Sequence, residues 1–135
     1  MNDNRSKDSL TLVARTDTEW DLLEALWRLE RATARQVAEA LAKKRGWAYS
    51  TVKTLLDRMV AKGLVSARQV GNVWEYRAAV ERREARRSAW RRFLSSAFGG
   101  ATAPALEFLA HEAPLTRKQR AALRAMLEKE EEEHE

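Results

Sequence analysis

The side chains best suited to chemistry in this sequence are short hydroxyls and cations gathered between residues 47 and 65. Apolar residues recur in this stretch every three or four positions, which predicts an amphipathic helix with one buried stripe. Hydroxyls and cations near a helix N-terminus suit phosphate oxygens and base edges in a DNA major groove. We therefore name residues 47–63 the reading helix, although the same pattern fits a surface helix of any small domain. The face opposite the stripe should expose Ser50, Thr51, Lys53, Thr54 and Arg58.

The distribution of charge favours a polyanionic partner for the reading helix. The chain has 135 residues and a formal net charge of +5. Residues 33–69 hold eight Lys or Arg against two acidic residues, whereas residues 128–135 hold six Glu and one Lys. Positive charge thus surrounds the reading helix, a pattern typical of nucleic-acid binding but not proof of it.

Other classes of chemistry have no support in the sequence. The absence of cysteine excludes disulfides and thiolate metal sites. His111 and His134 lack metal-ligand partners at workable spacing, and no phosphate-binding loop or nucleophile motif occurs. No apolar run approaches the ~20 residues that span a bilayer, and no signal peptide is recognisable. We therefore expect no catalytic or metal-binding residues, no cofactor, no enzymatic activity, and a cytoplasmic location without membrane insertion.

Two helices should precede the reading helix and position it. Residues 16–19 and 33–36 have the form T-x-x-E and T-x-x-Q of a capping box, which marks a helix start. We expect the first helix to end near Leu29 and the second near Lys44, and Gly63 to cap the reading helix in a left-handed conformation. The side chains expected to face inward are Trp20, Leu23, Leu26, Trp27, Val37, Ala38 and Leu41.

Residues 65–77 change to an alternating period, and Gly71-Asn72 between their two halves is a two-residue hairpin signal. A β-hairpin directly after a helix-turn-helix is the wing of a winged helix. Arg68 and Asn72 should anchor the wing on the DNA backbone, with a solvated turn as an equal alternative. Thr33 and Arg35 should bind phosphate. The predicted DNA-contacting residues are thus Thr33, Arg35, Tyr49, Ser50, Thr51, Lys53, Thr54, Arg58, Arg68 and Asn72.

The segment after the wing contains three amphipathic helices and too little chain for a core of its own. We expect its apolar stripes to pack on a second subunit across a two-fold axis, with packing on the winged helix as the competing arrangement. Six arginines between residues 82 and 92 could contact phosphate, face solvent or pair with a second subunit. The expected dimer contacts are Trp90, Phe93, Leu94, Phe98, Leu106, Phe108, Leu109, Leu123, Met126 and Leu127.

The predicted fold is therefore mainly α with a small β-hairpin, a winged helix-turn-helix followed by a C-terminal three-helix dimerisation segment. We expect a flexible arm over residues 1–15, a DNA-binding domain over 16–79, a dimerisation segment over 80–127 and an acidic tail over 128–135. Basic residues of the arm could contact a minor groove, with simple disorder as the plainer alternative.

Four stretches of the sequence carry a family resemblance. TDTEWDLLEALW, TARQVAEAL, YSTVKTLLDRMVAKGLV and FGG resemble the penicillinase-repressor family of bacterial transcription regulators (BlaI/MecI/CopY type). The resemblance covers roughly Leu12 to Leu127 and is most specific over Ser50–Gly63. It implies a winged helix, a C-terminal dimerisation segment, repression from a palindromic operator and autoregulation, often of an operon for a β-lactamase and its sensor.

Two departures from the family bear on the inducing signal. In β-lactam-responsive members, a membrane metalloprotease pathway cleaves an Asn-Phe bond in the C-terminal segment. The matching position here is Glu107-Phe108, so the Asn is missing, and we prefer Phe108 as part of the dimer core. Copper-responsive members carry a Cys-rich motif, which this chain lacks. The inducer stays open.

The function we expect is a dimeric, sequence-specific repressor with two reading helices in successive major grooves of a palindromic operator. Autoregulation, and control of a β-lactamase and sensor-protease operon, are implied by the resemblance. The alternative is a winged-helix protein-interaction module, with its arginine face on an acidic partner and no preference for any duplex sequence.

Overall fold

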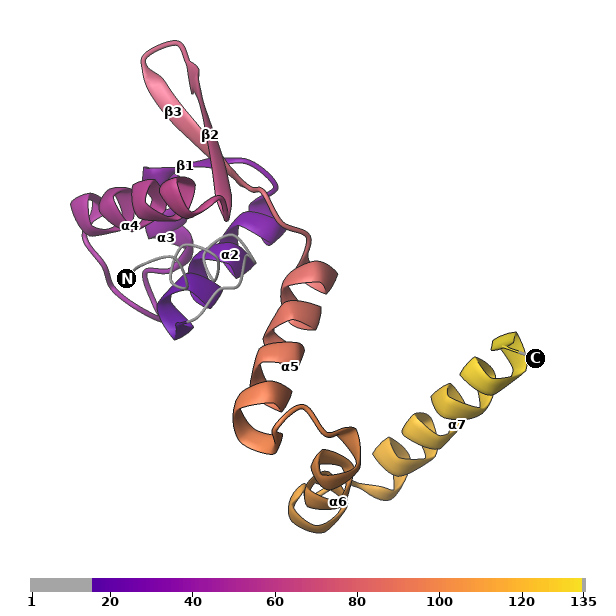
Figure 1. The fold of residues 1–135 in the computed structure, drawn as a ribbon. Coiled ribbons are helices and arrows are strands. Elements are labelled where there is room, and N and C mark those ends of the chain that lie inside the picture. The colour runs from indigo at the N-terminus through magenta and orange to yellow at the C-terminus, as the bar shows by residue number, and fades with distance from the viewer. Residues whose placement is uncertain (1–15, 135) are drawn as a thin grey trace. The chain divides into compact units, whose positions relative to one another are not determined.

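The computed structural model describes residues 16–134, which divide into two compact units at the Phe93–Leu94 bond. The first unit holds three complete helices, a small sheet and most of α5, and the second is helical (Figure 1). The predictions for residues 1–15 lie outside the described residues. In chain order the elements are α2 (Asp17–Leu29), β1 (Ala32–Thr33), α3 (Ala34–Ala40), α4 (Tyr49–Lys62), β2 (Val65–Val70), β3 (Val73–Ala78), α5 (Arg82–Phe98), α6 (Thr102–Glu112) and α7 (Arg117–His134).

The helix starts lie where the capping residues predict them. The Thr16 hydroxyl accepts a hydrogen bond from the Glu19 backbone N–H at 3.1 Å, in front of α2. Thr33 and Gln36 exchange backbone-to-side-chain hydrogen bonds of 2.9 and 3.2 Å, which completes the capping box of α3. Gly63 ends α4 with a φ of 84°, the left-handed conformation expected of it. These local signals fix where α2 and α3 begin and where α4 ends. The predicted start of the reading helix at residue 47 is wrong by two residues, because α4 begins at Tyr49 and its N-cap, Ala48, makes no side-chain capping hydrogen bond.

The prediction that the second helix reaches Lys44 is wrong, because α3 ends at Ala40 and residues 41–45 form turns. Lys44 and Arg45 instead turn toward α2, where their side chains donate to the two carboxylate oxygens of Asp21 at 2.9 and 2.7 Å. The Asp21 side chain is only 10% exposed. A contact between distant parts of the chain thus overrides the local helical tendency of this basic stretch.

The core of the first unit lies between α2, α3, α4 and the sheet. Its fully buried large side chains come from α2, α3, α4, β3 and the residue after Gly63. Trp20 and Trp27, which were expected to face inward, are only partly buried and pack at the edge of the core. The Trp27 indole N–H donates to the Val80 carbonyl at 2.9 Å, and the Arg82 guanidinium lies 5.2 Å from the Trp27 ring centre. The largest fully buried side chains are Leu22, Leu23, Leu26, Val37, Val52, Leu56, Met59, Leu64 and Tyr76.

The sheet has three antiparallel strands in the order β1-β3-β2, one strand more than predicted. β1 pairs Ala32 with Tyr76, and its two residues are too few to show an alternating period in the sequence. β2 and β3 pair in register around Gly71-Asn72, as expected of the wing. Gly71 has a φ of 63° and Asn72 does not have a positive φ, the pattern of a type II′ turn. The hairpin extends away from the three helices, so its tip is free of the core (Figure 1).

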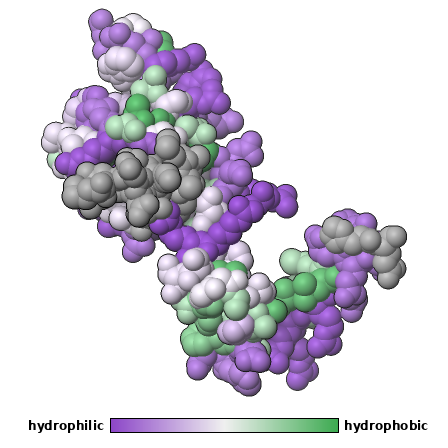
Figure 2. Space-filling view, in the orientation of Figure 1, coloured by the Kyte–Doolittle hydropathy of each residue, from purple (hydrophilic) through white to green (hydrophobic). Residues whose placement is uncertain are grey.

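The second unit contains the end of α5 together with α6 and α7. Thr116 and Gln119 form a capping box ahead of α7, with hydrogen bonds of 2.9 and 3.0 Å. α7 continues to His134, so the acidic residues between 128 and 133 prolong a helix. Large apolar side chains remain exposed in this unit, and Figure 2 shows hydrophobic residues, in green, at its surface. None of the helices between residues 16 and 134 has the length and apolarity that a bilayer crossing requires.

Candidate nucleic-acid interface

The outward face of α4 is formed by the side chains opposite its buried stripe. Val52, Leu56 and Met59 are fully buried, which turns the other side of the helix to solvent. Ala48, at the N-cap, offers no side-chain acceptor to the first backbone N–H groups of α4. These N–H groups and the helix dipole favour an anionic partner at this end of the helix. The predicted residues that this face exposes are Tyr49, Ser50, Thr51, Thr54 and Arg58.

One of these hydroxyls already has a partner within the helix. The Thr54 Oγ1 donates to the Ser50 carbonyl oxygen one turn earlier, at 3.0 Å. A hydroxyl that donates its proton keeps lone pairs as acceptors. Thr54 is therefore presented as a hydrogen-bond acceptor, which matches the exposed amino groups of adenine or cytosine in a major groove.

A groove of about 290 Å³ lies where the start of α3, the start of α4 and the wing meet. Five of the ten residues predicted to contact DNA line it, although they come from β1, α3, α4 and the turn between β2 and β3. Val73 and Trp74 complete the wall on the wing side. The groove therefore combines hydroxyl, cationic, amide and aromatic side chains in one place. The five predicted residues that line the groove are Thr33, Arg35, Tyr49, Lys53 and Asn72.

The groove residues from α3 and the start of α4 support one another. The Arg35 guanidinium lies 5.2 Å from the centre of the Tyr49 ring, a cation–π contact that orders the arginine side chain. The Thr33 hydroxyl accepts the capping hydrogen bond of α3 and keeps its own proton to donate. A phosphate oxygen in the groove would thus find a hydroxyl donor beside an ordered guanidinium.

Lys53 is not the free cation that its place in the sequence suggests. Its Nζ donates to the Asp57 Oδ2 at 2.9 Å and to the Tyr76 hydroxyl at 2.8 Å. These hydrogen bonds, that to Tyr76 first, raise the pKa of Lys53. Burial raises the pKa of Tyr76, and it acts in the same direction on Asp57. The hydrogen bonds from Lys53 and Tyr76 outweigh burial at Asp57, so the pKa of this carboxyl lies below its usual value.

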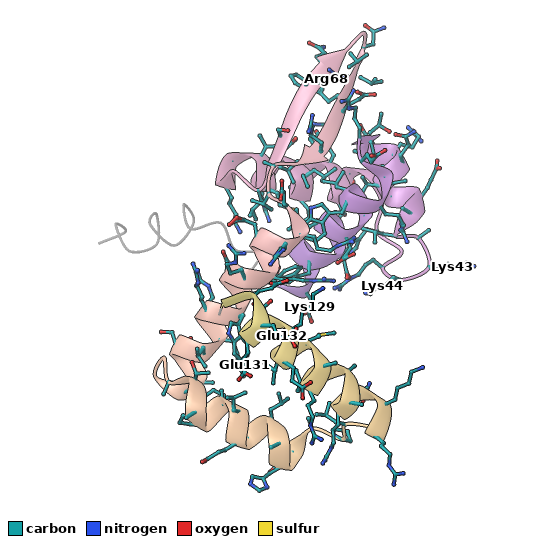
Figure 3. All side chains as sticks on the ribbon, turned by 90° about the vertical axis from the view of Figure 1, so that its right-hand side faces the viewer. Lys43, Lys44, Arg68, Lys129, Glu131 and Glu132 are labelled. Atoms are coloured by element: carbon teal, nitrogen blue, oxygen red, sulfur yellow. The ribbon has the colours of Figure 1, made fainter. Side chains whose placement is uncertain are left out.

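The wing places Arg68 and Asn72 on the hairpin, away from the core (Figure 3 labels Arg68). The Arg68 side chain is 60% exposed and lies 3.6 Å from the carboxylate of Glu75, its cross-strand neighbour. A weak pair of this kind leaves the guanidinium available to a phosphate. Arg68 also lines a second hollow of about 210 Å³, together with Arg31 and Arg77.

The sequence reasoning missed several residues around these two hollows. Trp74 lines the groove and is 43% exposed, yet the sequence predicts only that it lies in the second half of the wing hairpin. Arg31 and Arg77 had no assigned role, because they meet Arg68 only once β1, β2 and β3 pair. The spacing of Lys53 and Asp57, four residues apart on a helix, does predict their ion pair.

The residues predicted for dimer contacts are mostly apolar side chains without full burial. Leu94 and Phe98 are partly buried. The rings of Phe98 and Phe108 meet edge-on, with their centres 5.9 Å apart. In the first unit the rings of Trp90 and Phe93 pack against each other, with their centres 5.9 Å apart. Glu107 and Phe108 are both exposed on α6. The others, each between 42% and 63% exposed, are Leu106, Leu109, Leu123, Met126 and Leu127.

Comparison with known proteins gives the chain a family. A family model described as "Penicillinase repressor" matches residues 15–129. An uncharacterized 16.5 kDa protein of Latilactobacillus sakei, in the ptsI 3′ region, is 35% identical over 74 residues, 55% of this chain and 51% of that protein. The chain thus spans about half the length of this relative.

Two further proteins are similar over longer parts of their own lengths. The methicillin resistance regulatory protein MecI of Mammaliicoccus sciuri is 24% identical over 72% of this chain and 80% of that protein. Among solved structures, the DNA-binding domain of the repressor BlaI is 23% identical over 52% of this chain and 85% of that one, with a TM-score of 0.47. Because the family model spans nearly all of the described residues, the chain belongs to the penicillinase repressor family, a family of winged-helix DNA-binding transcriptional repressors and not of enzymes.

Proposed function

We propose that this protein is a dimeric, sequence-specific transcriptional repressor that binds a palindromic operator through α4, the groove and the wing. The observation that carries the proposal is the groove, which gathers five of the predicted contact residues beside the N-terminal end of α4. That end presents unsatisfied backbone N–H groups and exposed hydroxyls together. The arrangement suits a DNA backbone at the groove and base edges along α4.

The proposed contacts fall into two kinds. Side chains on the outward face of α4 would read base edges in the major groove, and Arg58 is the exposed cation among them. Thr33, Arg35 and the wing residues Arg68 and Asn72 would bind phosphates and so fix the register of the protein on the duplex. The proposed base-reading residues are Ser50, Thr51, Thr54 and Arg58.

The dimer is proposed from the exposed apolar surface of the second unit. Leu106, Phe108, Met126 and Leu127 are each more than half exposed, an unfavourable arrangement for an isolated chain in water. A second copy related by a two-fold axis would cover the same surface on both subunits. It would also set two α4 helices on the two halves of a symmetric site.

The finer assignments follow from this picture. We propose residues 16–79 as the DNA-binding part and residues 80–127 as the dimerisation part. Phe108 belongs to the proposed dimer surface, and without an Asn before it we do not assign the bond after Glu107 as a cleavage site.

The relative MecI is by its name a regulator of methicillin resistance, which supports an operon of antibiotic resistance as the regulated target.

Footprinting of the purified protein on the DNA upstream of its own gene tests the proposal. We expect two protected half-sites related by two-fold symmetry, with centres roughly 10 base pairs or a multiple apart. Protection there would also support autoregulation. A protein-interaction module would bind this DNA no better than a random duplex. Equal binding to the two DNAs would therefore contradict the proposal.

A further inference from the structure

Three polar side chains at the base of the wing form a closed hydrogen-bonded network. Lys53 and Asp57 lie one turn apart on α4, and Tyr76 comes from β3, the middle strand of the sheet. The Lys53 Nζ donates to the Tyr76 hydroxyl at 2.8 Å and to both carboxylate oxygens of Asp57, at 2.9 and 3.2 Å. The Tyr76 hydroxyl donates in turn to the Asp57 Oδ1 at 2.8 Å. Each member therefore contacts the other two.

The network runs from the core to the DNA-facing surface. Tyr76 is 1% exposed, whereas the side chains of Lys53 and Asp57 are 33% and 53% exposed. An exposed ion pair of this spacing is weak by itself and readily exchanged for a phosphate. The buried phenol changes this, because it accepts from the ammonium group and donates to the carboxylate. The two charges are thus held together at a fixed place on the sheet.

We infer that Asp57 is a specificity-determining residue, which neutralises Lys53 and so lowers attraction to random DNA at the reading face. The inference rests on the proposed repressor function. Cation–phosphate attraction supplies most of the affinity for non-specific DNA, whereas base-edge contacts distinguish the operator. With Lys53 neutralised, the outward face of α4 relies on its hydroxyls and Arg58. The pair therefore lowers the total affinity for DNA but raises the ratio of operator affinity to affinity for random DNA.

The test compares two duplexes of equal length, the footprinted operator and a shuffled sequence, with the full chain over a range of salt concentrations. Asp57→Asn keeps the side-chain shape and removes its charge. We expect it to bind the shuffled duplex roughly three- to tenfold more tightly near 0.1 M salt, with a log–log salt slope steeper by about 0.9. The ratio of operator to shuffled affinity should fall by a similar factor. An unchanged ratio and slope would overturn the inference.

Two further variants separate the network from general charge effects. Glu81→Gln removes the same charge from an exposed position ahead of α5 and serves as the matched control. If it changes the ratio as much as Asp57→Asn, the effect is not local and the inference fails. Tyr76→Phe keeps the buried ring and removes only the hydroxyl. It should shift binding in the same direction as Asp57→Asn, by a smaller factor, and a ratio equal to wild type would overturn the role of the phenol.

The double variant Lys53→Met with Asp57→Asn gives the sharpest outcome. Because it removes both charges of a neutral pair, we expect the wild-type salt slope on the shuffled duplex. A slope shallower by about 0.9 would show that Lys53 contacts a phosphate when DNA is bound, and would overturn the inference. Wild-type protein without any preference for the operator would instead refute the proposed function, so the two failures are distinguishable.

Discussion

At the scale of single residues, the proposed DNA-binding side of the first unit contains side chains of two kinds: some are hydrogen-bonded within the protein, and others extend into solvent. Arg58 extends from α4 into solvent, whereas Thr54 and Lys53 are hydrogen-bonded within the protein. Arg35 is intermediate between these two kinds. The Tyr49 ring orders its guanidinium through a cation–π contact, which leaves the N–H donors free to bind a phosphate. Base reading and phosphate binding should therefore respond differently to truncation.

Thr54→Ala tests base reading. If Thr54 accepts a hydrogen bond from a base, the variant should lose about 1–3 kcal/mol of binding free energy on the operator and nothing on a shuffled duplex. Arg35→Ala is the contrasting control, because loss of a phosphate contact should weaken both duplexes and reduce the salt slope by about one. Titrations of both duplexes at fixed salt give the measurement. Equal losses on the two duplexes for Thr54→Ala would contradict its assignment as a base reader.

Asp21 makes a prediction about pH and stability. The hydrogen bond from Lys44, opposed by burial and assisted by Arg45, holds the pKa of Asp21 below its ordinary value of 3.8. The carboxylate therefore stabilises the fold above that value, and the contribution is lost as the pH falls through the lowered pKa. Asp21→Asn should lower the free energy of unfolding by about 1–3 kcal/mol at pH 7, with a narrowing difference below pH 3.8.

Urea denaturation at pH 7 and pH 3 checks this prediction for Asp21. Asp17→Asn removes a carboxylate from the exposed first turn of the same helix and should cost less than about 1 kcal/mol at pH 7. A difference between wild type and Asp21→Asn that stays constant from pH 7 to pH 3 would rule out the ion-pair explanation.

At the scale of helices and strands, local chemistry predicts starts and ends better than lengths. The capping threonines and Gly63 are sufficient to locate α2, α3 and the end of α4, because their hydrogen bonds form between near neighbours. The end of α3 could not be predicted, since the basic residues after it form ion pairs with Asp21, which lies more than twenty residues earlier than Lys44 and Arg45. β1 could not be predicted either, because two residues become a strand only when β3 lies beside them.

The same distinction applies to the candidate site. The outward residues of α4 could be predicted, because helical periodicity alone assigns them to one face. The groove exists only when β1, α3, α4 and the wing are in their folded arrangement, so the place of Trp74 in it could not be predicted from the sequence. Tyr76 was assigned to the right strand, but its hydrogen bonds to α4 depend on how the sheet packs.

Gly71 makes a prediction for the wing. Its φ of 63° is unfavourable for a side chain with a Cβ, although no atom lies within 4 Å of where that Cβ would be. Gly71→Ala should therefore cost about 1–2 kcal/mol of backbone strain and no steric clash. Gly71→Asn is the matched variant, because Asn tolerates positive φ more readily and should cost less. Denaturant unfolding of both variants measures this, and equal stability of Gly71→Ala and wild type would contradict the turn geometry.

At the scale of the whole molecule, the proposed function makes operator affinity depend on whether two winged helices are joined in a dimer. The exposed apolar side chains of α6 and α7 are the proposed joint, and a charge there should separate the subunits because it would be buried without a partner. Phe108→Glu should therefore give a monomer by sedimentation at micromolar concentration. Operator affinity should fall about a hundredfold or more, since the second half-site is no longer bound by the same assembly.

The control for this variant is Leu29→Glu, which places the same charge at an exposed apolar residue at the end of α2. It should leave both the oligomeric state and the operator affinity as in wild type. If the wild-type protein itself sediments as a monomer, the dimer proposal fails. If Phe108→Glu stays dimeric, the interface lies elsewhere.

The hydrogen bond from Trp27 to the Val80 carbonyl also governs how the chain leaves the sheet. Together with the Arg82 side chain, which lies over the indole and pairs with Glu24, it clamps the first turn of α5 to α2. A rotation of α5 about its first turn would break three contacts at once: the Trp27 hydrogen bond, the contact of Arg82 with the indole and the ion pair of Arg82 with Glu24. In the proposed dimer, any tolerance for operators with different half-site separations would therefore have to come from further along the chain. Gly99-Gly100 is one such place, because both residues have positive φ and an added Cβ would meet nothing within 4 Å.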